Sequence, residues 1–298
     1  MKHSLICGQT RAIVDDVGAE LISFHKDIEY LWQGDPAYWE GHSPVLFPNP
    51  SVLMNDTICI AGKEYHLEKH GFVRGKQFTV VAQSPSAITL LYKANAETLA
   101  QYPFDFALYV RHEIDENGFV TCYRVENNDS KTMYFCIGGH PSFNCPMREG
   151  ESFEDYDLRF SEMENARAYY TNQGKYMDRD LFWHRLNNTD TWQLKHSDFD
   201  RDSSIFEGLK SDYVSLIHRH TGEGIRMHIG NFPALVIWKA EKSNAPFLCI
   251  EPWQGIPAVK GESGNFEDKP YAVKLLPGET YQSSFAMEIC QRGKNTVE

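Results

Sequence analysis

Short runs of β-favouring residues follow one another along almost the whole chain, and this feature most constrains the fold. Turn residues separate the runs, which is typical of antiparallel sheets. We predict strands over 78–82, 87–92, 106–114, 119–127, 133–137, 213–218, 225–229, 234–238, 247–250, 272–276 and 281–289. Asp115-Glu-Asn-Gly118 is the clearest hairpin signal, because Asn-Gly readily supplies the positive φ angles of a tight turn. The Pro-Gly pair between the last two runs predicts a final hairpin.

Amphipathic helices are scarce, and one short helical turn over 96–100 with Asn95 as its N-cap is expected. Strands and helices do not alternate, which disfavours a doubly wound parallel sheet. The prediction is therefore an all-β fold, a large antiparallel β-sandwich. The sequence has no repeat and no linker-like stretch, so a single domain over 1–298 is expected. Periodicity is poor over 145–205, where strands are predicted at 157–161 and 166–171.

Charge and composition exclude several classes of partner. The 298 residues include 29 Lys and Arg against 41 Asp and Glu, a formal net charge of −12 that opposes binding to nucleic acid or anionic lipid. No apolar run approaches the roughly 18–20 residues that span a bilayer, and the N-terminus lacks the apolar core of a signal peptide. The seven cysteines are scattered without a C-x-x-C pair, which indicates reduced thiols. A cytoplasmic protein is expected.

His140 is the first candidate for chemistry. It follows a predicted strand in Ile137-Gly-Gly-His-Pro-Ser-Phe-Asn144. The two glycines allow another group to approach the backbone closely, and Pro141 biases His140 away from helical geometry. An imidazole held at the rim of a sheet would be within reach of a ligand. A turn histidine that caps the strand is an equally good interpretation of these residues.

Glu251 is the second candidate, at the end of the apolar run in Phe247-Leu-Cys-Ile-Glu-Pro-Trp253. A carboxylate that is buried without a partner is costly, and burial raises its pKa into the range of a general base near neutral pH. The alternative is a glutamate held in a structural ion pair. Trp253 offers a flat apolar wall for a sugar ring, which favours a functional interpretation. Cys249, two residues earlier, is interpreted as an inward-facing strand thiol.

His70 and Arg74 lie close together in Lys69-His-Gly-Phe-Val-Arg-Gly75. Such a pair can hydrogen-bond a polar ligand or stabilise negative charge. A structural arginine that binds backbone carbonyls is at least as good an explanation. His66 and His70 do not form an H-E-x-x-H motif, and the motifs of esterases and nucleotide-binding proteins are absent, so no metal and no cofactor are expected.

The order and spacing of these segments resemble the aldose 1-epimerase (galactose mutarotase-like) superfamily, and in particular its LacX-type bacterial branch. The shared segments run through nearly the whole chain. They are Gly18–Ser23, Leu31-Trp-Gln-Gly34, Tyr38-Trp39, Pro44-Val-Leu-Phe-Pro48, His70–Arg74, Tyr102-Pro-Phe104, Gly139-His-Pro-Ser-Phe143, Asp202–Phe206, Leu209–Ser211, Phe232-Pro233, Trp238 and Glu251-Pro-Trp-Gln-Gly255.

This resemblance implies the galactose mutarotase-like supersandwich and interconversion of the α and β anomers of a hexose. It implies that His140 protonates the ring oxygen, that Glu251 deprotonates the anomeric hydroxyl, and that His70 and Asp202 contact the sugar. One position departs from the family pattern: relatives often carry an arginine shortly before Pro44-Val-Leu-Phe-Pro48, where this chain has Gly41. His42 or Arg74 would then supply the missing contact.

Three alternatives remain from the sequence. A hexose-6-phosphate mutarotase needs several basic side chains around one phosphate, and Arg74, Lys239 and Lys260 are the candidates. A non-catalytic carbohydrate-binding or regulatory protein on the same scaffold would bind aldoses without exchanging their anomers. A cupin-like metal isomerase would lose activity on chelation. In each case the expected partner is a small-molecule aldose or sugar phosphate, and a monomer or homodimer is expected.

Overall fold

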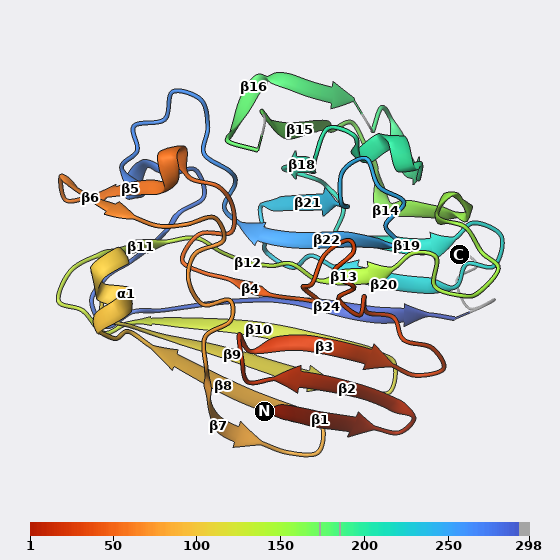
Figure 1. Ribbon diagram of the computed structural model, residues 1–298, viewed down its shortest axis with the longest axis horizontal. Coiled ribbons are helices and arrows are strands. Elements are labelled where there is room, and N and C mark those ends of the chain that lie inside the picture. The colour runs from red at the N-terminus through yellow and green to blue at the C-terminus, as the bar shows by residue number, and fades with distance from the viewer. Residues whose placement is uncertain (173, 185, 292–298) are drawn as a thin grey trace.

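Two large sheets form the body of the molecule, in a computed structural model that describes residues 1–172, 174–184 and 186–291 (Figure 1). All strand pairs within the sheets are antiparallel. The larger sheet has nine strands. In spatial order they are β17 (Thr189–Gln193), β14 (Tyr156–Glu164), β19 (Tyr213–His218), β20 (Gly224–His228), β24 (Thr280–Cys290), β10 (Gly118–Asn127), β9 (Phe106–Ile114), β8 (Ala87–Lys93) and β7 (Thr79–Gln83).

The second sheet has eight strands and lies above strands β24, β10, β9, β8 and β7 of the first sheet in Figure 1. Seven of its strands form a continuous path, and β13 pairs with β22 beside that path. The path is β16 (Tyr176–His184), β15 (Arg167–Asn172), β18 (Ser204–Glu207), β21 (Ala234–Trp238), β22 (Phe247–Gln254), β12 (Ile137–Gly139) and β4 (Val45–Leu46), with β13 over Ser142–Asn144.

Three smaller sheets and a few short helical segments complete the described structure. The sheets are β1 (Lys2–Cys7), β2 (Thr10–Asp15) and β3 (Glu20–His25), then β5 (Thr57–Ile60) with β6 (Lys63–His66), and β11 (Met133–Phe135) with β23 (Val273–Leu275). The helical segments are α1 (Ala96–Gln101) and the 3₁₀ turns Met54–Asp56, Phe153–Asp155, His196–Phe199 and Phe266–Asp268. None of the helices described is long enough to cross a membrane.

The two large sheets share a core because their strands alternate apolar and polar residues. In β9 the buried side chains recur at every second position from Phe106 to Ile114, so one face of the strand points into the core. The sheets touch through Tyr123 on β10, whose hydroxyl donates to the carbonyl of Gly138 on β12 at 3.4 Å. The rings of Phe160 and Phe206 meet 6.2 Å apart across the same layer. Full burial of one such ring contributes about 1.5–3 kcal/mol.

Most of the predicted elements are confirmed. The all-β antiparallel sandwich is present, and α1 carries the expected cap, with Asn95 Oδ1 accepting hydrogen bonds from the amides of Glu97 and Thr98. The strands predicted at 157–161 and 166–171 correspond to β14 and β15. The strands from β1 to β6, β13, and the strands from β16 to β18 were not predicted. The single domain over 1–298 stays a prediction.

Two predictions about strands are wrong, and a third is confirmed with a different turn geometry. The last two strands do not form a hairpin, because β23 pairs with β11 whereas β24 pairs with β10 and β20. The run over 133–137 is broken at Cys136, where the chain passes from one sheet to another. The turn between β9 and β10 is present but contains no positive φ angle. Instead, Asp115 Oδ1 accepts hydrogen bonds from the amides of Asn117 and Gly118, at 2.8 and 2.6 Å.

Candidate functional site

A break in the second sheet brings His140 and Glu251 together. Strands β12 and β13 both pair with β22, near the centre of Figure 1. The register is the same on both sides of the break, since Gly138 pairs with Trp253 and Ser142 pairs with Cys249. His140 therefore stands opposite Glu251. Proline follows each of the two residues, and proline has no N–H to donate to the ladder, which explains the interruption.

Glu251 is not at the end of its strand as predicted, because β22 continues through Pro252 to Gln254. The continuation is possible because the neighbouring strand is interrupted there. The amide of Ile250 still reaches across the gap and donates to the carbonyl of Pro141 at 3.1 Å. The carboxyl group thus projects from the middle of a buried strand.

His140 and Glu251 form a buried pair. The distance from His140 Nε2 to Glu251 Oε2 is 3.3 Å, and their side chains are 8% and 1% exposed. Within the described residues, His140 Nδ1 and Glu251 Oε2 have no hydrogen-bond partner. Buried polar atoms are rarely left unsatisfied, so an unpartnered atom on each member of this pair points to a ligand that supplies the missing partners.

Burial shifts the two pKa values in opposite directions. It raises the pKa of the Glu251 carboxyl well above its ordinary value; the positive charge of Lys69 opposes this rise, and the carboxylate of Asp202 adds to it. Burial lowers the pKa of His140 well below its ordinary value, and His70, Lys69 and Arg74 lower it further. Both shifts favour a neutral carboxylic acid beside a neutral imidazole.

The glycines before His140 have the role predicted for them, which is to let other groups approach. A Cβ on Gly138 would lie 2.5 Å from Cδ1 of Trp253. Trp253 uses this space and donates from Nε1 to the carbonyl of Gly139 at 3.2 Å. A Cβ on Gly139 would collide with the ring of Phe285 from the other sheet, at 2.7 Å.

A cavity of about 420 Å³ opens above the pair. All six residues predicted for the site line it: His70, Arg74, His140, Asp202, Glu251 and Trp253. The structure therefore brings together residues from separate segments of the chain. Other lining residues were not predicted as site residues, among them Trp39, Lys69 and Trp238. Trp39 and Trp238 belong to segments that carry the family resemblance, which was the signal that could have found them.

His70 is held in one tautomer. Its Nδ1 lies 2.7 Å from the carbonyl oxygen of Pro50, so this nitrogen donates and Nε2 is left as an acceptor. Burial lowers the pKa of His70 to about 3, with a further contribution from Lys69, so the ring is neutral. Its ring centroid lies 5.7 Å from that of His140, edge to face. A neutral acceptor in this place can bind a sugar hydroxyl.

Asp202 reaches the cavity from the loop before β18. Its backbone has a positive φ of 80°, which is uncommon for a residue with a side chain and which aspartate tolerates better than most. Thr171 donates its hydroxyl to Asp202 Oδ2. This contact ties the carboxylate to β15 at the lining of the cavity.

The basic side chains proposed for a phosphate do not converge. Lys260 pairs with Asp178 at 2.7 Å and lies outside the cavity. Lys239 is fully buried, donates to the carbonyl of Ser243 and has a pKa lowered to about 8 by burial. Arg74 lines the cavity, whereas His42 is directed to Glu20, with 3.8 Å between Nδ1 and Oε1. Of the two compensating residues proposed for Gly41, the cavity therefore holds Arg74.

One group of side chains has the composition of a metal site. His140, Cys249 and Glu251 are buried, and each offers a ligand atom within 4.8 Å of the others. A thiolate, an imidazole and a carboxylate are ligands that Zn²⁺ accepts. A metal bound there would occupy both members of the His140–Glu251 pair, so the same atoms cannot serve as free acid and base at the same time.

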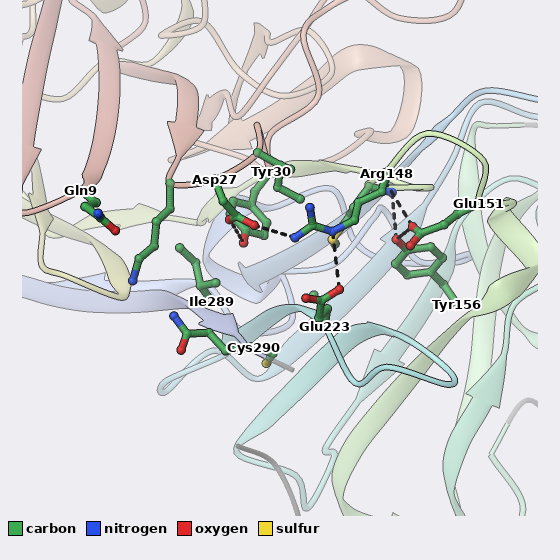
Figure 2. A pocket seen from close by; sticks show the side chains of 14 residues that line it. Gln9, Asp27, Tyr30, Arg148, Glu151, Tyr156, Glu223, Ile289 and Cys290 are labelled. Carbon is green, nitrogen blue, oxygen red and sulfur yellow. Dashed lines mark hydrogen bonds and ion pairs between the residues drawn. The ribbon is translucent and has the colours of Figure 1, made fainter. Parts of the chain in front are cut away.

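A second cavity, of about 390 Å³, lies beside the end of β24 and is lined by side chains that pair with one another (Figure 2). Figure 2 shows Arg148 between two carboxylates, 2.6 Å from Asp27 and 3.5 Å from Glu223. Tyr156 donates its hydroxyl to Glu151 in the same cavity. These groups are thus paired with one another, unlike the unpartnered atoms at His140 and Glu251.

The chain is similar to known proteins in both sequence and fold. The sequence model of a family described as aldose 1-epimerase matches residues 1–288. The plasmid-encoded protein LacX of Lactococcus lactis subsp. lactis is 37% identical over 285 residues, which cover 92% of this chain and 94% of that protein. A galactose mutarotase related enzyme from Lactobacillus acidophilus has a TM-score of 0.91 at 31% identity, with full coverage of both chains. A galactose mutarotase-like protein from Lactobacillus casei has a TM-score of 0.88 at 28% identity, covering 97% of this chain and 100% of that one.

Proposed function

The chain belongs to the aldose 1-epimerase family, and from this premise we propose that it interconverts the α and β anomers of a hexose. The reaction is ring opening and reclosure by general acid–base catalysis, with Glu251 as the base and His140 as the acid. The observation that carries the proposal is the buried His140–Glu251 pair, 3.3 Å apart at the floor of the cavity, with an unpartnered atom on each of these described residues.

The chemistry requires two proton transfers at neighbouring oxygens. One group removes the proton from the anomeric hydroxyl while the other protonates the ring oxygen, and the C1–O5 bond breaks. The open aldehyde rotates about its C1–C2 bond and recloses as the two transfers reverse. Because both oxygens are bonded to the same carbon, an acid and a base that lie side by side can reach both. Each positioned transfer contributes about 10²–10⁴-fold.

Burial favours the state that ring opening produces. The reaction begins with ionised Glu251 and protonated His140, and opening leaves a neutral acid and a neutral imidazole. The raised pKa of Glu251 and the lowered pKa of His140 both stabilise that neutral arrangement. Both arrangements hold one proton between the two residues, so the pair returns to its starting state when the ring recloses.

Other lining residues would bind and orient the sugar. Trp253 and Trp238 present apolar ring surfaces on which a sugar can stack. His70 Nε2 would accept a hydrogen bond from a sugar hydroxyl, and Asp202 would accept another. These roles agree with the resemblance and with the position of each group in the cavity.

A hexose 6-phosphate is the second candidate substrate, because Lys69 and Arg74 both line the cavity. Two cations can stabilise a phosphate, although the other basic residues proposed for it lie elsewhere. A non-catalytic sugar-binding protein is disfavoured, since binding alone does not require a buried acid beside a base. The cytoplasmic location and the monomeric or dimeric state stay predictions.

The proposal is tested by polarimetry on freshly dissolved α-anomers of glucose, galactose, glucose 6-phosphate and galactose 6-phosphate. At least one of these should equilibrate much faster with the protein than without it. Preference for a phosphorylated sugar, lost in Lys69→Gln and in Arg74→Gln, would select the second candidate. If the protein binds a sugar but the anomers equilibrate only at the background rate, the non-catalytic alternative would be selected.

A further inference from the structure

Trp39 lies flat against the imidazole of His140. The ring centroids are 4.8 Å apart with 26° between the planes, a stacked arrangement. The indole is held from other sides by aromatic neighbours, Trp238 at 5.5 Å and Phe247 at 5.9 Å. The main-chain carbonyl of Trp39 accepts a hydrogen bond from Trp32 Nε1 at 2.9 Å. The ring is therefore fixed by packing and by its backbone.

Gly41 leaves the room that this indole occupies. A Cβ on Gly41 would lie 2.4 Å from Cζ2, 2.7 Å from Cη2 and 2.8 Å from Cε2 of Trp39. Gly41 does not have a positive φ angle, so its backbone does not need glycine. The lack of a side chain matters because of the ring beside it.

We propose that Gly41 and Trp39 position His140 for acid catalysis: Gly41 admits the indole, and the indole face supports the protonated imidazole. This inference rests on the proposed function. Trp39 is a positioning residue, because it acts through His140 and transfers no proton. Gly41 determines whether the indole can take its place.

The charges around His140 show why such support is needed. Lys69, His70 and Arg74, all from the segment that precedes β7, disfavour a positive charge on His140. On the side of β22, Glu251 favours that charge and the thiol of Cys249 lies close by. The face of an indole attracts cations, and more strongly where it is shielded from water. Trp39 thus offsets part of the effect of burial and of the neighbouring cations.

The test compares Trp39→Phe, Trp39→Leu and Gly41→Ala by the NMR titration of His140, assigned by its absence in His140→Asn. In Trp39→Leu we expect the pKa of His140 to fall by about half to one unit. The acid limb of the kcat profile should move to lower pH by the same amount, and kcat should fall about three- to tenfold. Trp39→Phe, which keeps an aromatic face, should lie between wild type and Trp39→Leu.

The double variant separates the role of Gly41 from a general loss of stability. Gly41→Ala alone should resemble Trp39→Leu, because the new methyl group displaces the indole. Added to Trp39→Leu, it should cause no further change, since the group it strikes is gone. A pKa of His140 that is unchanged in Trp39→Leu would overturn the proposal, and so would an additive loss in the double variant.

The NMR titration does not depend on turnover. If no sugar is epimerised by the wild type, the proposed function fails while the shift in the pKa of His140 can still be measured. If the wild type is active and Trp39→Leu lowers kcat with no shift in that pKa or in the acid limb, the positioning role fails and the proposed function stands.

Discussion

Burial holds Glu251 in an ionisation state that the unfolded chain would not favour near neutral pH, and it holds His140 neutral at a pH where the unfolded chain would be protonated. Burial raises the pKa of Glu251 above 4.5 and lowers that of His140 below 6.5. A structural ion pair would show the reverse, since each charge would stabilise the other. Neutral groups with unpartnered atoms are instead ready to exchange protons with a ligand. The ionisation states and the unpartnered atoms therefore favour a catalytic role for His140 and Glu251 over a structural one.

The pH dependence of kcat follows from the single proton that the pair shares. Below the lowered pKa of His140 the pair takes up a second proton, and above the raised pKa of Glu251 it loses its only one. We expect a bell-shaped profile whose acid limb lies well below pH 6.5 and whose alkaline limb lies well above pH 4.5. Initial rates of anomer exchange across the pH range check this. A rate that rises steadily with hydroxide would contradict it.

Glu251→Gln should stabilise the protein at neutral pH while it abolishes activity. A raised pKa in the folded state means that the stability associated with this group is full below about pH 4.5 and falls as pH rises toward the folded pKa. Glutamine does not titrate, so the variant avoids this loss. Its free energy of unfolding at neutral pH should exceed that of wild type by about 0.5–2 kcal/mol. Thermal unfolding of both proteins at several pH values tests the sign. Wild type and variant should differ little in acid and diverge as pH rises.

At the scale of elements, the site depends on an interrupted ladder. Strands β12 and β13 keep one register along β22, and His140 occupies the gap between them. Gly138, Gly139, Pro141 and Pro252 could each be interpreted from the sequence as local signals. Together they place His140 opposite Glu251. This juxtaposition could not be predicted, because it depends on the pairing of segments more than a hundred residues apart. Such pairing is not encoded in local patterns.

The hairpin between β9 and β10 shows a similar limit. Its position could be predicted, but its geometry depends on Asp115, whose carboxylate binds the amides of Asn117 and Gly118. Removing this acceptor in Asp115→Ala should lower the free energy of unfolding by about 1 kcal/mol. Asp115→Asn keeps an acceptor oxygen and is the matched control. Denaturant unfolding checks both, with mutarotase activity at saturating sugar expected to remain unchanged.

At the scale of the whole molecule, strands of the second sheet and loops from distant segments line one cavity. The six site residues that sequence and resemblance predicted all reach that cavity. Trp39 and Lys69 were missed as site residues because each lies on a loop whose path depends on tertiary packing. Lys239 and Lys260 were wrong as phosphate ligands for the same reason, since only the fold shows which way a lysine points.

Chelation separates acid–base catalysis from a metal-dependent isomerase. Because His140 and Glu251 would act as free acid and base, activity should survive treatment with EDTA and removal of the chelate. Adding Zn²⁺ should inhibit, as His140, Cys249 and Glu251 offer ligand atoms within 4.8 Å of one another. Loss of activity on chelation, restored by a stoichiometric metal, would support the metal isomerase instead.

The most direct test of the central claim is exchange NMR between the α and β anomers of the preferred sugar. Rates are compared for wild type, His140→Asn and Glu251→Gln. His66→Asn and Glu64→Gln serve as matched controls, since both residues are exposed and lie outside the cavity. We expect each active-site variant to remain folded and to lose about 10²–10⁴-fold in rate, with the controls at the wild-type level. Near-normal exchange by either active-site variant would contradict the assignment of His140 and Glu251 as acid and base.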